Sequence, residues 1–148
     1  NEVNEIFNKN YKFIPGNAKE IIRDKKNFII SSGPMIHNCI EAIQILKRKY
    51  NIKVGLVNIN TFKPLKKFSL NKILKLAKNI LVVEDHTFYG GLFSIVNQKL
   101  KENKKINIDY LAINDDFVDS GKPIELEKKY GLDPLNIAKK FIKIENTK

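Results

Sequence analysis

Short apolar runs alternate with amphipathic segments along most of the chain, and this alternation limits the possible folds more than any other feature. Runs rich in Ile, Val and Leu predict buried strands, and apolar residues at helical spacing predict the helices between them. The expected strands cover residues 18–23, 28–31, 52–59, 80–84 and 106–112, and the expected helices begin near Pro34, Ser69, Gly91, Pro123 and Pro134. Strands that alternate with helices indicate an α/β fold, with a parallel sheet covered by helices on both faces.

Local signals refine this order of elements. The polar stretch Asp24–Asn27 is typical of a hairpin connection, so the first strand is expected to run antiparallel to the second. Ser69 is a good N-cap, and Phe68 and Ile73 are placed for a hydrophobic staple across it. Gly131 is expected to end one C-terminal helix, and Asp133 to cap the next.

The length of 148 residues predicts one domain, and the first eleven residues are expected to form a polar tail before a domain at 12–148. No apolar run approaches the roughly 20 residues of a membrane helix, and no signal peptide is apparent. The lone Cys39 excludes an internal disulfide and favours a reducing, cytoplasmic location. Because the only methionine is Met35, we expect the chain to be part of a longer protein.

The formal net charge of +11 raises the question of nucleic acid. However, 25 of the 27 basic residues are Lys, and only Arg23 and Arg48 offer the bidentate guanidinium that phosphate and base recognition favours. The chain also holds 22 Ile and 18 Asn, and these residues share A/T-rich codons with Lys. A solvated basic surface therefore accounts for the charge, and no nucleic-acid partner is predicted.

Several motifs of catalytic and binding sites are absent. The sequence has no GxGxxG or GxxxxGK[ST] loop for phosphates, and no CxxC or HExxH motif for zinc. Cys39 falls on the apolar face of its expected helix, which favours a core position over a nucleophile.

Two segments remain as candidates for a binding site, because each follows the carboxyl end of an expected strand. If the two strands are neighbours, both segments line one crevice, and ligands bind at such crevices in open α/β sheets. The first leads into a helix N-terminus that favours an anion, and the second joins an acidic pair and a histidine to a Gly-Gly step. The candidate residues are Ser31, Ser32, Gly33, Glu84, Asp85, His86, Gly90 and Gly91.

The polar residues of these segments also have structural interpretations. Adjacent strand residues point to opposite faces, so Glu84 and Asp85 are expected to form a salt bridge or a helix cap rather than share a proton. His37 and His86 are both expected near this end of the sheet, where a hydrogen-bonding structural role competes with a functional one.

Five motifs, taken in order, together resemble the C-terminal domain of the transketolase family. The resemblance covers roughly residues 12 to 143. The motifs are Ser32–Ile36, the strand and "KP" loop Val57–Leu65, the acidic–His element Val82–His86 with Gly90–Leu92, Ile113–Phe117 with Ser120–Pro123, and Glu127–Asp133.

The resemblance implies a three-layer α/β/α domain whose five-stranded mixed sheet has one antiparallel edge strand. It also implies a parent enzyme that depends on thiamine diphosphate and Mg²⁺ and moves two-carbon ketol units between sugar phosphates. In this family the cofactor lies between two other domains at a dimer interface. Those domains carry a GDG…N motif and an activating glutamate, and this chain contains neither.

The family's C-terminal domain generally supplies no catalytic, cofactor-binding or metal-binding residue, so none is expected here. The expected partners are the cofactor-binding domains, in the same chain or in a separate subunit, within a homodimeric parent. The loop with Glu84, His86, Gly90 and Gly91 is then expected to face the rest of the protein. The domain would support the dimer and could have a regulatory role.

Alternatives stay open at this point. Deoxyxylulose-phosphate synthase and the beta subunits of 2-oxoacid dehydrogenases share the same domain, although the segment from Asn114 to Gly121 favours transketolase. A stand-alone ligand-binding or interaction module would use the crevice by itself, and a nucleic-acid binder would rest on charge alone.

Overall fold

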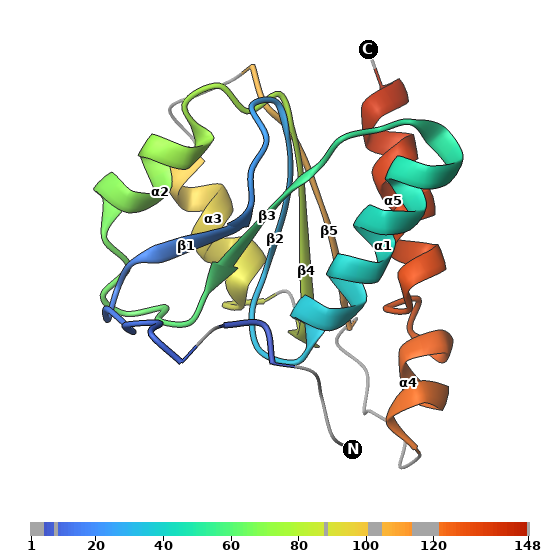
Figure 1. Ribbon diagram of the computed structural model, residues 1–148, viewed down its shortest axis with the longest axis horizontal. Coiled ribbons are helices and arrows are strands. Elements are labelled where there is room, and N and C mark those ends of the chain that lie inside the picture. The colour runs from blue at the N-terminus through green and yellow to red at the C-terminus, as the bar shows by residue number, and fades with distance from the viewer. Residues whose placement is uncertain (1–4, 8, 88, 101–104, 114–121, 148) are drawn as a thin grey trace.

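A five-stranded mixed sheet lies between two layers of helices in the computed structural model (Figure 1). The structure describes residues 5–7, 9–87, 89–100, 105–113 and 122–147. The strands are β1 (Ala18–Ile22), β2 (Asn27–Ser31), β3 (Gly55–Ile59), β4 (Asn79–Thr87) and β5 (Asn107–Ile113). The helices are α1 (Met35–Tyr50), α2 (Lys67–Leu74), α3 (Leu92–Leu100), α4 (Pro123–Lys129) and α5 (Pro134–Asn146).

The strand order is β1-β3-β2-β4-β5. β2 is parallel to both β3 and β4, and β4 is parallel to β5, whereas β1 pairs antiparallel with β3 at one edge. The predicted α/β class, the mixed sheet and its single antiparallel edge strand are thus confirmed.

The predicted hairpin between β1 and β2 is wrong, because β3 lies between these two strands. All residues of β2 after Asn27 are buried, which suits a central strand with a neighbour on each side. The polar stretch still turns the chain, since Asp24 Oδ1 accepts hydrogen bonds from Lys26 N at 2.8 Å and Asn27 N at 2.9 Å.

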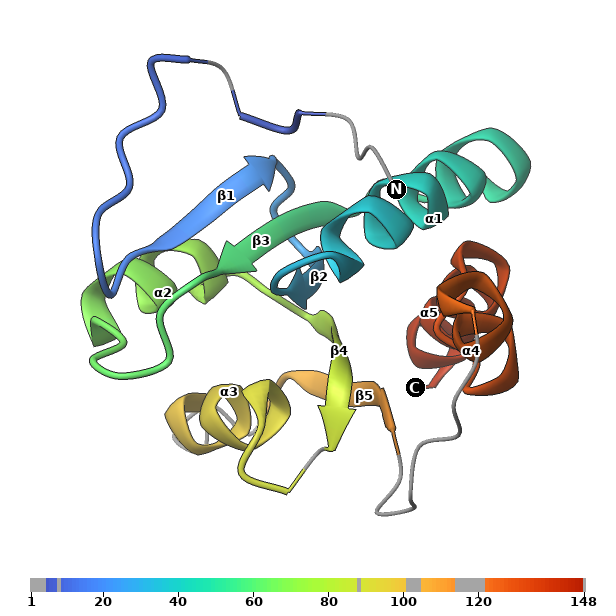
Figure 2. The ribbon, with the colours of Figure 1, turned by 90° about the horizontal axis from the view of Figure 1, so that it is seen from below.

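Alternate residues of the central strands pack into two separate apolar cores. Ile29, Leu56 and Leu81 belong to the apolar cluster that includes residues of α1 and α5. Their neighbours along the strands, such as Ile30 and Val57, belong to the cluster under α2 and α3. Figure 2 shows α1 and α5 on one side of the sheet and α2 and α3 on the other. The period of two along each strand therefore produces the three layers.

Helix ends follow the predicted signals except at α2. Asp133 caps α5, because its side chain accepts from Leu135 N and Asn136 N, and Gly131 before it adopts a φ of +70°. α2 begins before Ser69, so the predicted N-cap is wrong. Ser69 Oγ instead donates to Lys66 O and accepts from Ala18 N, each at 3.0 Å, and so joins the helix to β1. The predicted staple is wrong as well, because Phe68 is 81% exposed.

An asparagine ladder crosses the amino ends of three parallel strands. Asn27, Asn79 and Asn107 pair in register as the first residues of β2, β4 and β5. Asn79 Nδ2 donates to Asn27 Oδ1 at 2.9 Å, and Asn107 Nδ2 donates to Asn79 Oδ1 at 3.2 Å. These side-chain bonds are made only in this register, so they oppose a slip of the strands.

Some sequence predictions lie outside the described residues, among them Asn114–Phe117 and the step from Ser120 to Gly121. Ile6, in the segment predicted as a tail, packs against the apolar cluster of α1 and α5. The boundary at residue 11 stays a prediction. None of the helices that the structure describes is long and apolar enough to cross a membrane.

Candidate functional site

The two candidate segments meet at one edge of the sheet. β2 and β4 are parallel neighbours, with Ser31 opposite Val83, and Figure 1 shows that both end at the lower rim of the sheet. Ser31 is fully buried, and its Oγ donates a hydrogen bond to Val83 O at 2.7 Å. α1 and α3, which follow these strands, cover opposite faces of the sheet (Figure 2). This is a topological switch point, so the condition set in the sequence analysis, that the two strands are neighbours, is met.

Glu84 is the buried acidic group of this region, with 2% of its surface exposed. Its Oε2 accepts a hydrogen bond from Leu92 N at 2.7 Å, and its Oε1 accepts one from Phe93 N at 3.0 Å. Both donors belong to the first turn of α3, which has no acidic residue of its own. The carboxylate therefore caps α3 from the neighbouring strand and lies at the positive end of the helix dipole. Of the two alternatives predicted for Glu84, the structure shows the cap.

Two opposing effects act on the pKa of Glu84. Burial raises its pKa above the ordinary value of a glutamate, because the charged form loses hydration. The N–H groups of Phe93 and Leu92 lower it, since they bond to the carboxylate, and burial is the larger effect. Two N–H donors thus hold the carboxylate in place, although its burial makes the negative charge energetically costly.

Gly90 and Gly91 both allow this contact, and each is a glycine for a different structural reason. Gly90 adopts a φ of +72°, a left-handed conformation that side chains disfavour. A Cβ atom at Gly91 would lie 2.2 Å from Glu84 Oε2 and 2.6 Å from Thr87 O. Gly91 is therefore required for the close approach of the carboxylate to the start of α3.

Asp85 and His86 belong to β4, which extends to Thr87, rather than to a loop as predicted. The side chain of His86 is 76% exposed, and its Nε2 lies 3.7 Å from Asp85 Oδ1. Glu84 is buried, Asp85 is partly exposed and His86 is exposed, and the pairing of β4 with β5 is irregular between Val83 and Thr87. Glu84 and Asp85 thus lie in different environments, and that they do not share a proton stays a prediction.

The first segment is less available to an anion than its sequence suggests. Ser32 is half-buried, and Gly33 is exposed with a φ of +58°. In the first turn of α1, the N–H groups of Ile36 and His37 donate to Gly33 O at 3.3 Å and Pro34 O at 3.1 Å. Pro34 has no N–H to offer, so much of the donor capacity at this helix start is already used.

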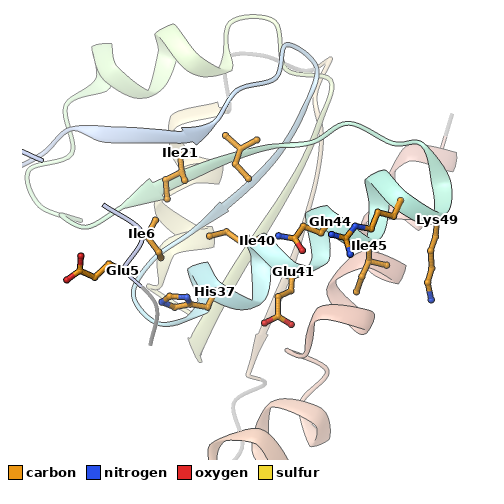
Figure 3. A pocket seen from close by; sticks show the side chains of 11 residues that line it. Glu5, Ile6, Ile21, His37, Ile40, Glu41, Gln44, Ile45 and Lys49 are labelled. Atoms are coloured by element: carbon orange, nitrogen blue, oxygen red, sulfur yellow. The ribbon is translucent and has the colours of Figure 1, made fainter. Parts of the chain in front are cut away.

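His37 lies in the first turn of α1, at the same end of the sheet as His86, as expected. It lines a hollow of about 800 Å³ between α1, β1 and the N-terminal segment. Figure 3 shows Ile6, Ile21 and Ile40 around this hollow, with Glu41 and Lys49 farther along α1. β1 is separated from β4 by β3 and β2, so this hollow does not extend the candidate crevice.

Cys39 is buried in the core, as predicted, and desolvation raises the pKa of its thiol to about 12. A thiol with this pKa is not a nucleophile near neutral pH.

Sequence reasoning missed Asn58, which is 4% exposed and lies opposite Ser31 in the sheet. Among the residues that the structure describes, Asn58 Oδ1 is a buried oxygen that lacks a hydrogen-bond partner. The signal in the sequence is a polar residue inside an otherwise apolar strand. The motif Val57–Leu65 contains Asn58, but its sequence predicted no role for this residue.

The comparisons with known proteins agree with this architecture. A model of the family "Transketolase, C-terminal domain" matches residues 16–137. The chain belongs to the transketolase C-terminal domain family.

Curated relatives of this transketolase C-terminal domain include two kinds of enzyme. It is 36% identical over 127 residues to a 1-deoxy-D-xylulose-5-phosphate synthase of Clostridium tetani, which covers 84% of this chain and 20% of the relative. It is 35% identical over 132 residues to a transketolase of Homo sapiens, which covers 86% of this chain and 21% of the relative. The chain thus spans about a fifth of the length of these relatives.

Solved structures with the same fold include a split-gene transketolase described as an inactive β4 tetramer. The TM-score is 0.86 at 27% identity, and the match covers 96% of this chain and 46% of the other. A transketolase from Pichia stipitis in complex with sedoheptulose-7-phosphate shares the fold at a TM-score of 0.66 and 22% identity, covering 87% of this chain and 18% of that one.

Proposed function

We propose that this chain is the C-terminal domain of a thiamine-diphosphate-dependent transketolase that transfers two-carbon ketol units between sugar phosphates. Membership of the transketolase C-terminal family supports this proposal, as does the similarity to transketolases in sequence and in fold. Because the chain spans about a fifth of its curated relatives, the catalytic site of the parent would lie in other domains.

The domain itself would have a structural role and support a homodimeric parent. The observation that carries this view is the bidentate contact of Glu84 with the start of α3. A diphosphate would need those same N–H groups, and the buried carboxylate would repel it, so the candidate residues do not fit the cofactor. Within the part of the chain that the structure describes, no group of three or more His, Cys, Asp or Glu side chains could hold a metal ion.

In this proposal, some candidate residues fix the backbone conformation and the others contact the partner domains. Ser31, Glu84, Gly90 and Gly91 would fix the backbone at the carboxyl edge of β2 and β4. Ser32, Gly33, Asp85 and His86 would then face the cofactor-binding domains, since each of them is at least partly accessible. A rigid edge of this kind would present the same polar surface to a partner domain each time the parent assembles.

Calorimetric titration of the 148-residue chain with thiamine diphosphate and Mg²⁺ tests whether the cofactor site lies outside this chain. We expect no heat of binding to this chain alone. Addition of the upstream domains should then give both cofactor binding and ketol transfer from a ketose phosphate to an aldose phosphate. Stoichiometric binding to the isolated chain would show that the cofactor site lies in this chain and that the proposal is wrong.

A second experiment tests the proposed contact surface. The double variant Asp85→Lys and His86→Glu should weaken association with the upstream domains while the melting temperature of the isolated chain stays unchanged, because both side chains face solvent. The variant Lys139→Glu, on the exposed face of α5, is the control. Equal effects of the two variants on association would contradict the proposal.

The deoxyxylulose-phosphate synthase branch is the second candidate for the parent. Its support is the 36% identity to the Clostridium tetani synthase, which is close to the 35% identity to human transketolase. Turnover of the reconstituted parent with a panel of ketose-phosphate and 2-oxoacid donors separates the two branches, because only the transketolase branch requires a ketol donor.

A further inference from the structure

A basic hollow of about 580 Å³ lies beside the outer edge of β1, between that strand and α2. Its cationic residues are Lys19, Arg23, Lys25, Lys66, Lys72 and Lys75. We call this surface the basic hollow. It is separate from the carboxyl edge of β2 and β4 and also from the hollow that contains His37.

Positive charge is concentrated in the basic hollow beyond the average of the chain. Six of its fourteen lining residues are basic, whereas the whole chain has 27 basic residues among 148. The two acidic residues in the lining leave a net charge of +4. Asp24 already accepts two backbone hydrogen bonds, and Glu20 Oε2 lies 3.7 Å from Arg23 Nε. The Arg23 side chain is still 93% exposed, so its charge is open to a partner.

Two large apolar side chains stand on the rim of the basic hollow. Phe68 is 81% exposed and Leu76 is 63% exposed, the first in α2 and the second just after it. Lys72 lies midway between them in sequence, so a basic residue is flanked by apolar ones at helical spacing. Exposed aromatic and aliphatic groups beside charge are typical of surfaces that anchor a partner.

The backbone beside the basic hollow is also open on one side. β1 is the first strand in the sheet order, so among the described strands only β3 pairs with it. Ala18 N donates to Ser69 Oγ at 3.0 Å, so this donor of β1 is bonded to α2 and is not available to an added strand. An extended polypeptide segment can add to such an edge, whereas a nucleic acid or a lipid surface cannot make those bonds.

We propose that the basic hollow is a docking site for an acidic polypeptide segment that also carries an apolar side chain. Carboxylates would pair with the lysines, and the apolar residue would pack against Phe68 and Leu76. The observations favour a polypeptide over nucleic acid because five of the six cations are Lys and the rim is partly apolar. They favour it over a lipid surface because the site is concave.

The test uses the 148-residue chain labelled with ¹⁵N and the peptide Glu-Asp-Glu-Leu-Phe-Glu-Asp-Glu as the probe. We expect amide shifts confined to residues 17–25 and 66–76, and binding that weakens as salt rises. The amide analogue of the peptide, with Gln and Asn in place of its acidic residues, should bind about tenfold more weakly or not at all.

Variants matched in net charge test whether the peptide binds at the basic hollow. The triple variant Lys66→Glu, Lys72→Glu and Lys75→Glu should weaken peptide binding by about tenfold or more. The control changes three exposed lysines of α4 and α5, Lys128→Glu, Lys139→Glu and Lys143→Glu, and has the same net charge. A second variant, Phe68→Ser with Leu76→Ser, should weaken binding about threefold without a change of charge.

The proposal is overturned if the peptide does not shift these amides, or if both triple variants weaken binding equally. It is also overturned if the peptide fails while an oligonucleotide or vesicles of anionic phospholipid bind in a way that depends on Lys66, Lys72 and Lys75. Because the experiment uses this chain alone, its outcome does not depend on the enzyme that the parent proves to be.

Discussion

Replacement of Glu84 by Gln removes one of the two hydrogen bonds that cap α3 and also removes the buried negative charge, with little change in size. Gln has nearly the same size and keeps one oxygen that can accept from Leu92 N or Phe93 N. Its amide nitrogen cannot accept a hydrogen bond, so the other backbone N–H is left facing a second donor. The variant therefore isolates the contribution of the second acceptor in a site that is 2% exposed.

The size of the effect follows from this loss. A buried donor left without a partner costs about 1–3 kcal/mol, and removal of the desolvated charge offsets part of this cost, so we expect the free energy of unfolding to fall by about 1 kcal/mol at neutral pH. In a domain of this length, a change of 1 kcal/mol corresponds to a shift in melting temperature of about 3 °C. Urea denaturation followed by circular dichroism measures the free energy directly.

The pH dependence gives a sharper test of the same contact. Burial raises the pKa of Glu84 in the folded state, so folding favours its protonated form. The stability that this group contributes is fully present below its unfolded pKa and is lost as pH rises through the raised folded pKa. A protonated carboxyl also keeps acceptor lone pairs on both oxygens. The difference in unfolding free energy between the wild type and Glu84→Gln should therefore grow as the pH falls from neutral through this window.

Asp85→Asn is the control, because it removes the next carboxylate along the strand. The Asp85 side chain is 37% exposed and lies 3.7 Å from His86, so its loss should change stability by less than about 0.5 kcal/mol. The reasoning is refuted if Glu84→Gln is as stable as the wild type at neutral pH. It is also refuted if the difference shrinks on acidification, because the two N–H bonds would then outweigh burial and lower the pKa.

Three further substitutions or probes test other parts of the structure. Gly91→Ala should destabilise the fold by about 2 kcal/mol or more, since the new Cβ atom overlaps Glu84 Oε2, whereas Gly90→Ala should cost about 1 kcal/mol for its positive φ alone; chemical denaturation of both variants measures the difference. Asn79→Ala should cost about 1–2 kcal/mol, because it removes both side-chain bonds at the centre of the asparagine ladder, and a thermal melt that matches the wild type would contradict this. The Cys39 thiol should not react with a disulfide reagent at pH 8 until the chain unfolds, because it is buried and its pKa is about 12; rapid reaction of the folded protein would show that the core opens there.

The strands and helices could be predicted because their signals are local. A run such as Ile80–Val83 is apolar at every position, and it is buried on both faces in the structure, as a central parallel strand must be. Asp133 and Gly131 also act through their immediate neighbours, so their roles could be assigned from the sequence.

The pairing of β1 could not be predicted in the same way. A short polar stretch between two strands is typical of a hairpin, and nothing near Asp24 indicates that β3 will lie between β1 and β2. The choice depends on which strand is buried on both sides, and that is decided by contacts between residues far apart in the chain. Ser69 shows the same limit, because its hydroxyl is used by Ala18 of β1 rather than by its own helix start alone.

The sequence placed both candidate segments at strand ends, but it could not establish that those strands are neighbours or what Glu84 contacts. The meeting of the two segments followed from the sequence only on the condition that β2 and β4 are neighbours, and the structure shows that they are. The sequence left a salt bridge and a cap as alternatives for Glu84, since the donors are eight and nine residues away across a turn of unknown path. The conformations of Gly90 and Gly91 decide that path, and they can be read only from the structure.

In the proposed parent enzyme, the buried contact of Glu84 would give this domain a structural role at the end of β4. The carboxylate satisfies two donors of α3 and so fixes the end of β4, and with it the partly exposed Asp85 and the exposed His86. Exposed polar groups on a rigid edge can recognise a neighbouring domain at little cost in conformational entropy. If Glu84→Gln loosens this edge, association with the upstream domains should weaken even though Glu84 itself touches no partner. Asp85→Asn would leave the edge rigid and alter only the contact.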